Sequence, residues 1–134
     1  MSAAPLSGLG ATLDNLQTNV FIADAQLNLV YANARALATA RSFEGEIRKL
    51  FGIGVEELVG ASIHRFHRNP HRVEDILRHA NRLPHSAQFS FGAVTLQTNI
   101  NRIPGPQGEI LGFVVNWEDV SEQVRTEAEL RVKT

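Results

Sequence analysis

The stretch that decides the fold is "VTLQTNINRIPGPQGEILGFVVNWE", residues 94–118. Apolar residues recur at every second position in its two halves, and "PGPQGE" (104–109) between them is rich in turn-forming residues. This alternation is typical of two strands joined by a loop, each with one apolar face. The inward faces would carry Val94, Leu96, Thr98 and Ile100 on the first strand, and Leu111, Phe113, Val115 and Trp117 on the second. We therefore expect an antiparallel sheet that is covered on one side.

The residues on the amino-terminal side supply three more strands and the helices that cover them. "HSAQFSFG" (85–92) alternates in the same way, and the two apolar runs of "NVFIADAQLNLVYAN" (19–33) predict a β-hairpin. Between these strands, residues 34–52 carry one apolar stripe and predict a helix, and residues 55–60 predict a short second one. Residues 62–68 predict a turn-like element, and Pro70 is suited to the first position of the next helix. The order predicts an α+β fold, a five-stranded antiparallel sheet with helices covering one face and a pocket between the layers.

The two ends of the chain are expected to lie outside this unit. We expect a loose lead-in over residues 1–11, a folded domain over residues 12–119 that opens with a short helix, and a charged helix over residues 120–134. Asp119 and Glu122 make a plausible cap for the last helix. Its thin apolar seam cannot bury much alone, so we expect it to pair with a partner helix or to continue into another module. The apolar residues at helical spacing on which these predictions rest are Leu9, Leu13 and Leu16 in the first helix, and Val120, Val124 and Ala128 in the last.

Composition excludes several classes of function. With 134 residues, 43% apolar content and a formal net charge of −1, the chain is long enough for one packed core and lacks a basic field for nucleic acid or an anionic membrane. It has no signal peptide pattern and no apolar run of membrane-spanning length. The absence of cysteine removes disulfides, cysteine metal sites and covalent heme attachment, and it favours a cytoplasmic location. No nucleophile–base pair or phosphate-binding loop is present, so we expect no catalysis.

Three landmarks together resemble a PAS domain from about Leu13 to Glu122. They are "NVFIADAQLNLVYAN" with its Asn33, "FGIGVEELVGASI" (51–63), and "GEILGFVVNWEDVSEQ" (108–123), which contains a variant of the family's D-I-T motif. The resemblance implies a sensory module with a ligand pocket. Light-sensing PAS domains that bind flavin or coumarate use a cysteine, which this chain lacks.

Within that family, "IHRFHRNPH" (63–71) resembles the heme-binding PAS domains of soluble aerotaxis-type chemoreceptors. There a histidine just before an Asn-Pro step binds the iron, and a tryptophan on the last strand faces the bound gas. The resemblance implies that His67 is the axial ligand of heme b (iron protoporphyrin IX) and that Trp117 faces the gas. The sequence departs from the pattern at Arg65 and Arg68, which are more basic than expected.

The histidine spacing by itself leaves other possibilities open. On one unbroken helix His64, His67 and His71 would share a face and could hold zinc, but Pro70 disfavours helical geometry just before it. Two alternatives stay open: His67 could bind nothing, or His64 or His71 could be the ligand in its place. His79 and His85 are expected to face solvent. Similarly, Trp117 could be an ordinary core aromatic or a hydrogen-bond donor to a gas. The rest of the pocket wall is expected to come from Leu96, Ile100, Phe113 and Val115, which could equally be ordinary core.

The favoured hypothesis is a heme-based sensor that binds O2 in the first place, with CO, NO and cyanide as further ligands, and signals through its last strand to a downstream module. A homodimer through the terminal helices is compatible with it. The alternative is a PAS domain without heme, which binds another small molecule or flavin or serves for dimerisation.

Overall fold

The structure, a computed structural model, describes residues 17–67, 70–79 and 83–133. Its sheet contains β1 (Asn19–Asp24), β2 (Leu29–Ala32), β3 (His85–Phe91), β4 (Val94–Pro104) and β5 (Ile110–Asp119). The order across the sheet is β2-β1-β5-β4-β3, and every neighbouring pair is antiparallel. The central strand is therefore β5, which the opening stretch of sequence predicted to carry Trp117.

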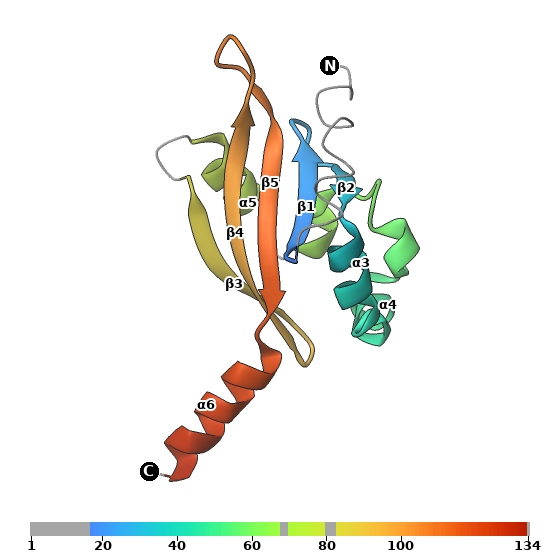
Figure 1. Ribbon diagram of the computed structural model, residues 1–134, viewed down its shortest axis with the longest axis vertical. Helices are drawn as coiled ribbons and strands as arrows, with labels where there is room; N and C mark the ends of the chain where they lie inside the picture. The colour runs from blue at the N-terminus through green and yellow to red at the C-terminus, as the bar shows by residue number, and fades with distance from the viewer. Residues whose placement is uncertain (1–16, 68–69, 80–82, 134) are drawn as a thin grey trace.

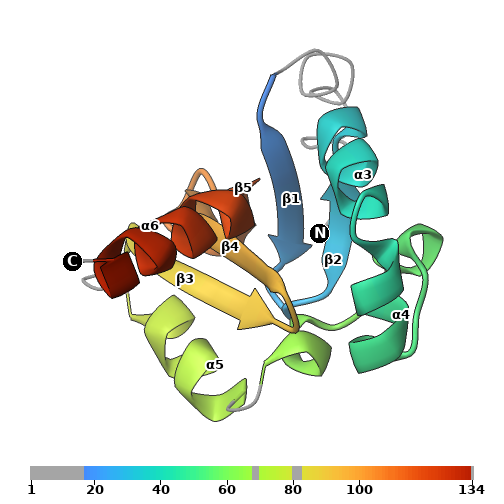
Figure 2. The same ribbon diagram turned by 90° about the horizontal axis from the view of Figure 1, so that it is seen from below.

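The helices are α3 (Ala34–Arg41), α4 (Glu44–Phe51), η1 (Val55–Glu57), η2 (Ile63–Phe66), α5 (Pro70–Arg78) and α6 (Ser121–Lys133), where η marks a 3-10 helix. Seen from below, α3 and α4 lie beside β1 and β2, and α5 lies beside β3 (Figure 2). Helix α6 projects away from the end of β5 (Figure 1). The α+β fold with a five-stranded antiparallel sheet is thus confirmed.

The single helix predicted over residues 34–52 is wrong, because α3 and α4 are separate helices. Asn33 caps α3 by accepting from the Ala36 N–H. At the other end, the N–H and the hydroxyl of Ser42 both donate to the Thr39 carbonyl (3.0 and 2.6 Å), which satisfies the last turn. Phe43 then leaves helical geometry at φ −127° and turns toward the sheet layer. The short helix predicted with Leu9, Leu13 and Leu16 lies mostly outside the described residues.

Strand β5 fits closely against β1 at Gly112. A Cβ atom on Gly112 would lie 2.2 Å from the Ala23 carbonyl oxygen, so only glycine allows this approach. Further along the same strand, Trp117 pairs with Asn19 on β1 and with Thr98 on β4. The register therefore places Trp117 in the middle of the sheet, between two strands that are far apart in sequence.

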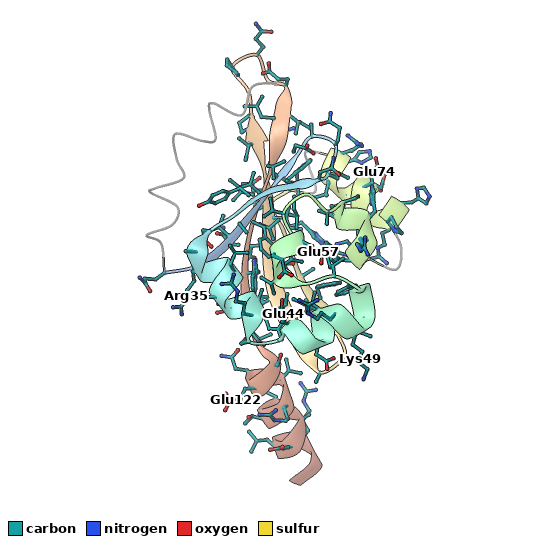
Figure 3. All side chains as sticks on the ribbon, turned by 90° about the vertical axis from the view of Figure 1, so that its right-hand side faces the viewer. Arg35, Glu44, Lys49, Glu57, Glu74 and Glu122 are labelled. Atoms are coloured by element: carbon teal, nitrogen blue, oxygen red, sulfur yellow. The ribbon has the colours of Figure 1, made fainter. Side chains whose placement is uncertain are left out.

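Two groups of buried apolar residues fill the layer between the sheet and the helices. The larger group lies under α3 and α4 and includes Ile47, Phe91 and Trp117, while the smaller contains Leu27, Leu77 and Phe113. Charged side chains such as Arg35, Lys49 and Glu122 lie on the outer sides of their helices (Figure 3). Among the described residues, no helix is both long and apolar enough to cross a bilayer.

Candidate functional site

A cavity of about 150 Å³ lies between the sheet and the helices, and its wall draws on both groups of buried residues. The wall is almost entirely apolar, and His67, Thr98 and Trp117 are the only ones of its described residues that carry polar side chains. A dry, apolar cavity with a few polar groups is the usual form of a small-molecule site. The six residues predicted for the site all line this one cavity, namely His67, Trp117, Leu96, Ile100, Phe113 and Val115.

The sheet side of the cavity follows from strand alternation. Leu96, Thr98 and Ile100 on β4 share a face with Phe113, Val115 and Trp117 on β5. The Thr98 hydroxyl donates to the Ala87 carbonyl (3.0 Å), so its proton is used within the sheet. Leu111, which was expected on the same face, is not part of the cavity wall.

Aromatic rings from the helix side and from β3 were missed by the sequence analysis as parts of the site. A row of contacting rings runs from His67 through Phe89, Phe91 and Phe43 to Trp117, with centroid separations of 5.0, 5.5, 5.7 and 6.1 Å. These separations lie within the range of favourable aromatic pairs. The row connects the predicted iron ligand to the predicted gas-facing residue along one wall of the cavity. The sequence did hold a signal for them, because phenylalanine occurs at positions 43, 51, 89 and 91. The pocket was predicted from the strands of residues 94–118 alone, so these four rings were not assigned to it.

The His67 imidazole lines the cavity from the side of α5. His67 follows the last residue of η2 in extended geometry (φ −116°, ψ 139°), and its ring packs on Phe89. Burial, and to a smaller extent the nearby His64, lowers the pKa of His67 below its ordinary value of 6.5. At neutral pH the ring is therefore uncharged, and one ring nitrogen keeps a lone pair that can bind a metal.

The other histidines do not reach the cavity wall. His64 is partly exposed, with its Nε2 3.8 Å from a carboxylate oxygen of Glu74 on α5, and His71 is exposed on α5. The three histidines around Pro70 therefore point in different directions, as the proline predicted, and no group of three metal-binding side chains occurs in the described residues. His79 is exposed as expected, and its Nδ1–H donates to the Asp75 carbonyl (2.6 Å). His85, at the start of β3, is half-buried, so it faces solvent only in part.

Arg65, one of the two unexpected basic residues, holds η2 in place. Its Nε and Nη2 donate to the Phe51 carbonyl at the end of α4 (3.2 and 3.1 Å). A cation at this position also complements the negative end of the α4 dipole. Phe51 in turn meets Phe66 edge-on at 5.1 Å, so η2 is fastened to α4 by both a polar and an aromatic contact. Arg68 lies outside the described residues.

Trp117 is 3% exposed, and its Nε1 is buried with no hydrogen-bond partner among the described residues. Its ring contacts Phe21 at 5.1 Å as well as Phe43. A buried donor without a partner costs about 1–3 kcal/mol, and native structures contain few such groups. The unpaired N–H is therefore a feature that needs an explanation, and a ligand in the cavity would supply one.

Three residues after Trp117, a set of hydrogen bonds fixes the turn into α6. The Val120 N–H donates to the Thr95 carbonyl (2.9 Å), and the Thr95 N–H donates to the Ser121 hydroxyl oxygen (2.8 Å). The Ser121 hydroxyl and N–H both donate to the Asp119 carboxylate (2.5 and 3.0 Å). Asp119 thus accepts a backbone N–H at the start of α6, as a capping residue does. The end of the central strand is thus fastened to β4 where α6 begins.

Comparisons with known proteins agree on the fold. A family model for the PAS fold matches residues 13–125. The chain is 32% identical over 130 residues to the methyl-accepting chemotaxis protein McpB of Pseudomonas aeruginosa; this match covers 96% of the chain but only 19% of that receptor.

Among solved structures, the chain resembles the Aer2 receptor from Vibrio cholerae, described as a dual PAS-heme oxygen sensor. The TM-score is 0.71 at 28% identity, and the match covers 77% of this chain and 94% of that one. An RNA-binding light-oxygen-voltage receptor shares the fold at a TM-score of 0.58 and 16% identity, covering 98% of this chain and 37% of that one.

Proposed function

This chain belongs to the PAS family, and from that premise we propose that it is a gas-sensing domain that binds heme b through His67. The similarity to a chemotaxis receptor and to a receptor described as a PAS-heme oxygen sensor supports this function. The observation that carries the proposal is the pairing of two groups in one apolar cavity: a neutral histidine and an unpaired indole N–H.

The chemistry of the donor set fits a heme. When bound, the heme supplies an iron with an open coordination position that takes up a diatomic gas reversibly, O2 in the first place. His67 would hold the iron through a neutral ring nitrogen, because burial disfavours protonation of the ring. Trp117 contributes a donor with no acceptor capacity, which favours ligands that accept a hydrogen bond. Leu96, Ile100, Phe113 and Val115 exclude water around both.

The size of the cavity adds a requirement to this proposal. A cavity of about 150 Å³ accepts a molecule such as benzene, and sites for larger ligands measure about 300–1,000 Å³. Heme binding must therefore widen the layer between the sheet and the helices. We expect the widening on the side of η2 and α5, because η2 has no buried residue and α5 has only Leu77.

The experiment is a hemin titration of the wild-type protein and of His67→Ala, followed by the Soret band. We expect a sharp band with wild type and its loss in His67→Ala. His71→Ala is the matched control, because His71 is exposed and does not line the cavity, and this variant should bind hemin like wild type. An unchanged spectrum in His67→Ala would refute the assignment, and loss of the band in His64→Ala or His71→Ala instead would move the ligand to that residue.

A second candidate function is favoured by the cavity volume. A small apolar molecule that accepts one hydrogen bond from Trp117 would fill about 150 Å³ without widening it. Flavin is less suited, because its ring edge needs several polar partners and the wall offers few. A protein that stays colourless with both hemin and flavin, yet gains thermal stability from a small aromatic ligand, would support this second function.

The output of the domain is proposed to leave through α6. The strand that carries Trp117 ends at the turn of Asp119 and Ser121, so a movement of the indole can change the angle of α6. We keep the boundaries proposed from the sequence, a domain over residues 12–119 and a signalling helix over 120–134, and α6 begins at Ser121. Exposed Leu130 on this helix is compatible with a homodimer or with a downstream module. We propose a cytoplasmic, non-enzymatic sensor in a chemoreceptor-like protein.

A further inference from the structure

Asn19 is a buried polar residue at the start of β1 that contacts the backbone of Trp117. It is 7% exposed and lies directly across from Trp117 in the β1–β5 pair. Its side-chain Nδ2 donates to the Trp117 carbonyl oxygen at 3.0 Å. A buried amide is costly unless both of its ends are paired, so its second partner determines whether this contact is fixed.

The second partner is Thr39 on α3, whose hydroxyl donates to Asn19 Oδ1 at 2.9 Å. Since the Trp117 carbonyl can only accept, the Asn19 NH2 group must face it, and Asn19 Oδ1 must face Thr39. The Trp117 carbonyl therefore fixes the orientation of the amide, and the Thr39 hydroxyl donates to the amide oxygen and completes its pairing. The three groups form one chain of hydrogen bonds from α3 through β1 to the central strand, of which the bond to Trp117 is buried and the bond from Thr39 is partly buried.

The helix at the start of this chain of bonds is itself fastened to β1. Asn33, which is fully buried, caps α3 and accepts from the Val20 N–H (3.1 Å), and its Nδ2 donates to the Thr18 carbonyl (2.8 Å). Thr39 repeats the attachment further along α3. The helix is thus fixed to β1 at two points, so the Thr39 hydroxyl is a well-held donor.

From this geometry we infer that Asn19 and Thr39 are positioning residues for the Trp117 indole and thereby set how strongly the site favours a gas that accepts a hydrogen bond. The inference rests on the proposed function. The indole N–H has no partner of its own in the described residues, so its direction depends on ring packing and on the backbone of Trp117. Packing restricts the ring plane through Phe21 and Phe43, while the Asn19 bond restricts the peptide. A small rotation of that peptide would misalign the N–H, and hydrogen bonds weaken steeply with angle.

The test compares Thr39→Val, which is close in shape and lacks the hydroxyl, with Thr39→Ser, which keeps it. The heme-loaded protein with Thr39→Val should bind O2 about three- to tenfold more weakly. Its CO affinity should change by less than about twofold, because bound CO is a poorer hydrogen-bond acceptor. Thr39→Ser should restore the wild-type ratio of O2 to CO affinity. In a Trp117→Phe background, Thr39→Val should have no further effect on that ratio.

A readout without heme keeps the inference separate from the proposed function. Trp117 is the only tryptophan, so its emission spectrum reports its surroundings directly. In heme-free protein Thr39→Val should shift this emission, and Thr39→Ser should not. A shift with no hemin binding would overturn the heme proposal but support the positioning role. Three results would overturn the positioning role. The first is a Thr39→Val protein with unchanged emission and an unchanged ratio of O2 to CO affinity. The second is an equal loss of O2 and CO affinity, and the third is a change in that ratio that persists in the Trp117→Phe background.

Discussion

Replacing Trp117 by phenylalanine should separate stability from gas affinity. The change removes the buried N–H that has no partner in the described residues, which relieves a cost of about 1–3 kcal/mol. The smaller ring leaves on the order of 40 Å³ of extra space beside the cavity, which costs about 1 kcal/mol at ~24 cal/mol per Å³, plus the transfer term of the lost atoms. These effects oppose each other, so the heme-free protein should change its free energy of unfolding by less than about 1 kcal/mol. The same substitution at an ordinary core tryptophan whose N–H is paired would lower the free energy of unfolding by more.

The O2 affinity of the same variant should fall about tenfold, because it loses one donor in a dry cavity. The assays are urea unfolding of the heme-free protein and O2 and CO titrations of the heme-loaded one. Val20→Ala is the control, since Val20 is 2% exposed and does not line the cavity, so it should lower stability and leave both affinities unchanged. A large loss of stability in Trp117→Phe with an unchanged O2 affinity would refute the reasoning and make Trp117 a plain core residue.

Three further predictions concern the rest of the site. Burial lowers the pKa of His67 in the folded protein, so the unfolded chain binds its proton first, and the free energy of unfolding falls as the pH drops below about 6.5 toward the folded pKa. In denaturant unfolding His67→Phe should flatten this fall, and an equal dependence of stability on pH in both proteins would contradict the prediction. Gly112→Ala should cost about 1–3 kcal/mol because its Cβ would meet the Ala23 carbonyl, and an unchanged unfolding midpoint would show that the strands separate freely. Ser121→Ala should cost about 1 kcal/mol and speed hydrogen exchange at the Thr95 amide, whose acceptor it removes; unchanged exchange would mean that this bond does not hold the turn.

The sheet was predictable from the sequence because apolar and polar residues alternate along β3, β4 and most of β5. The alternation in β4 and β5 identified Leu96, Ile100, Phe113, Val115 and Trp117 as inward, and all of them line the cavity. The same rule says nothing about how many residues a helix has before it breaks. Residues 34–52 kept a continuous apolar stripe across Ser42 and Phe43, and the break depends on hydrogen bonds to the Thr39 carbonyl that a stripe does not reveal.

The site was predictable only where a family resemblance or the alternation reached it. His67 was singled out by resemblance, and spacing alone could not separate it from His64 and His71. What distinguishes it in the structure is its place after η2, beside Phe89. Asn19 and Thr39 were missed because they lie 20 positions apart in the sequence, with no local pattern that pairs them, and only the antiparallel register brings Asn19 across from Trp117.

The polar groups of the cavity point to a principle of selectivity that holds whichever ligand enters. Thr98 uses its hydroxyl proton within the sheet, and the uncharged His67 ring carries one N–H and one nitrogen that can accept. The Trp117 N–H is buried at this cavity with no hydrogen-bond partner among the residues that the structure describes. In a medium of low polarity this donor counts for more than it would in water. A ligand that accepts one hydrogen bond is therefore favoured over an equally sized apolar one, and the discrimination is set by how firmly Trp117 is held rather than by the size of the cavity.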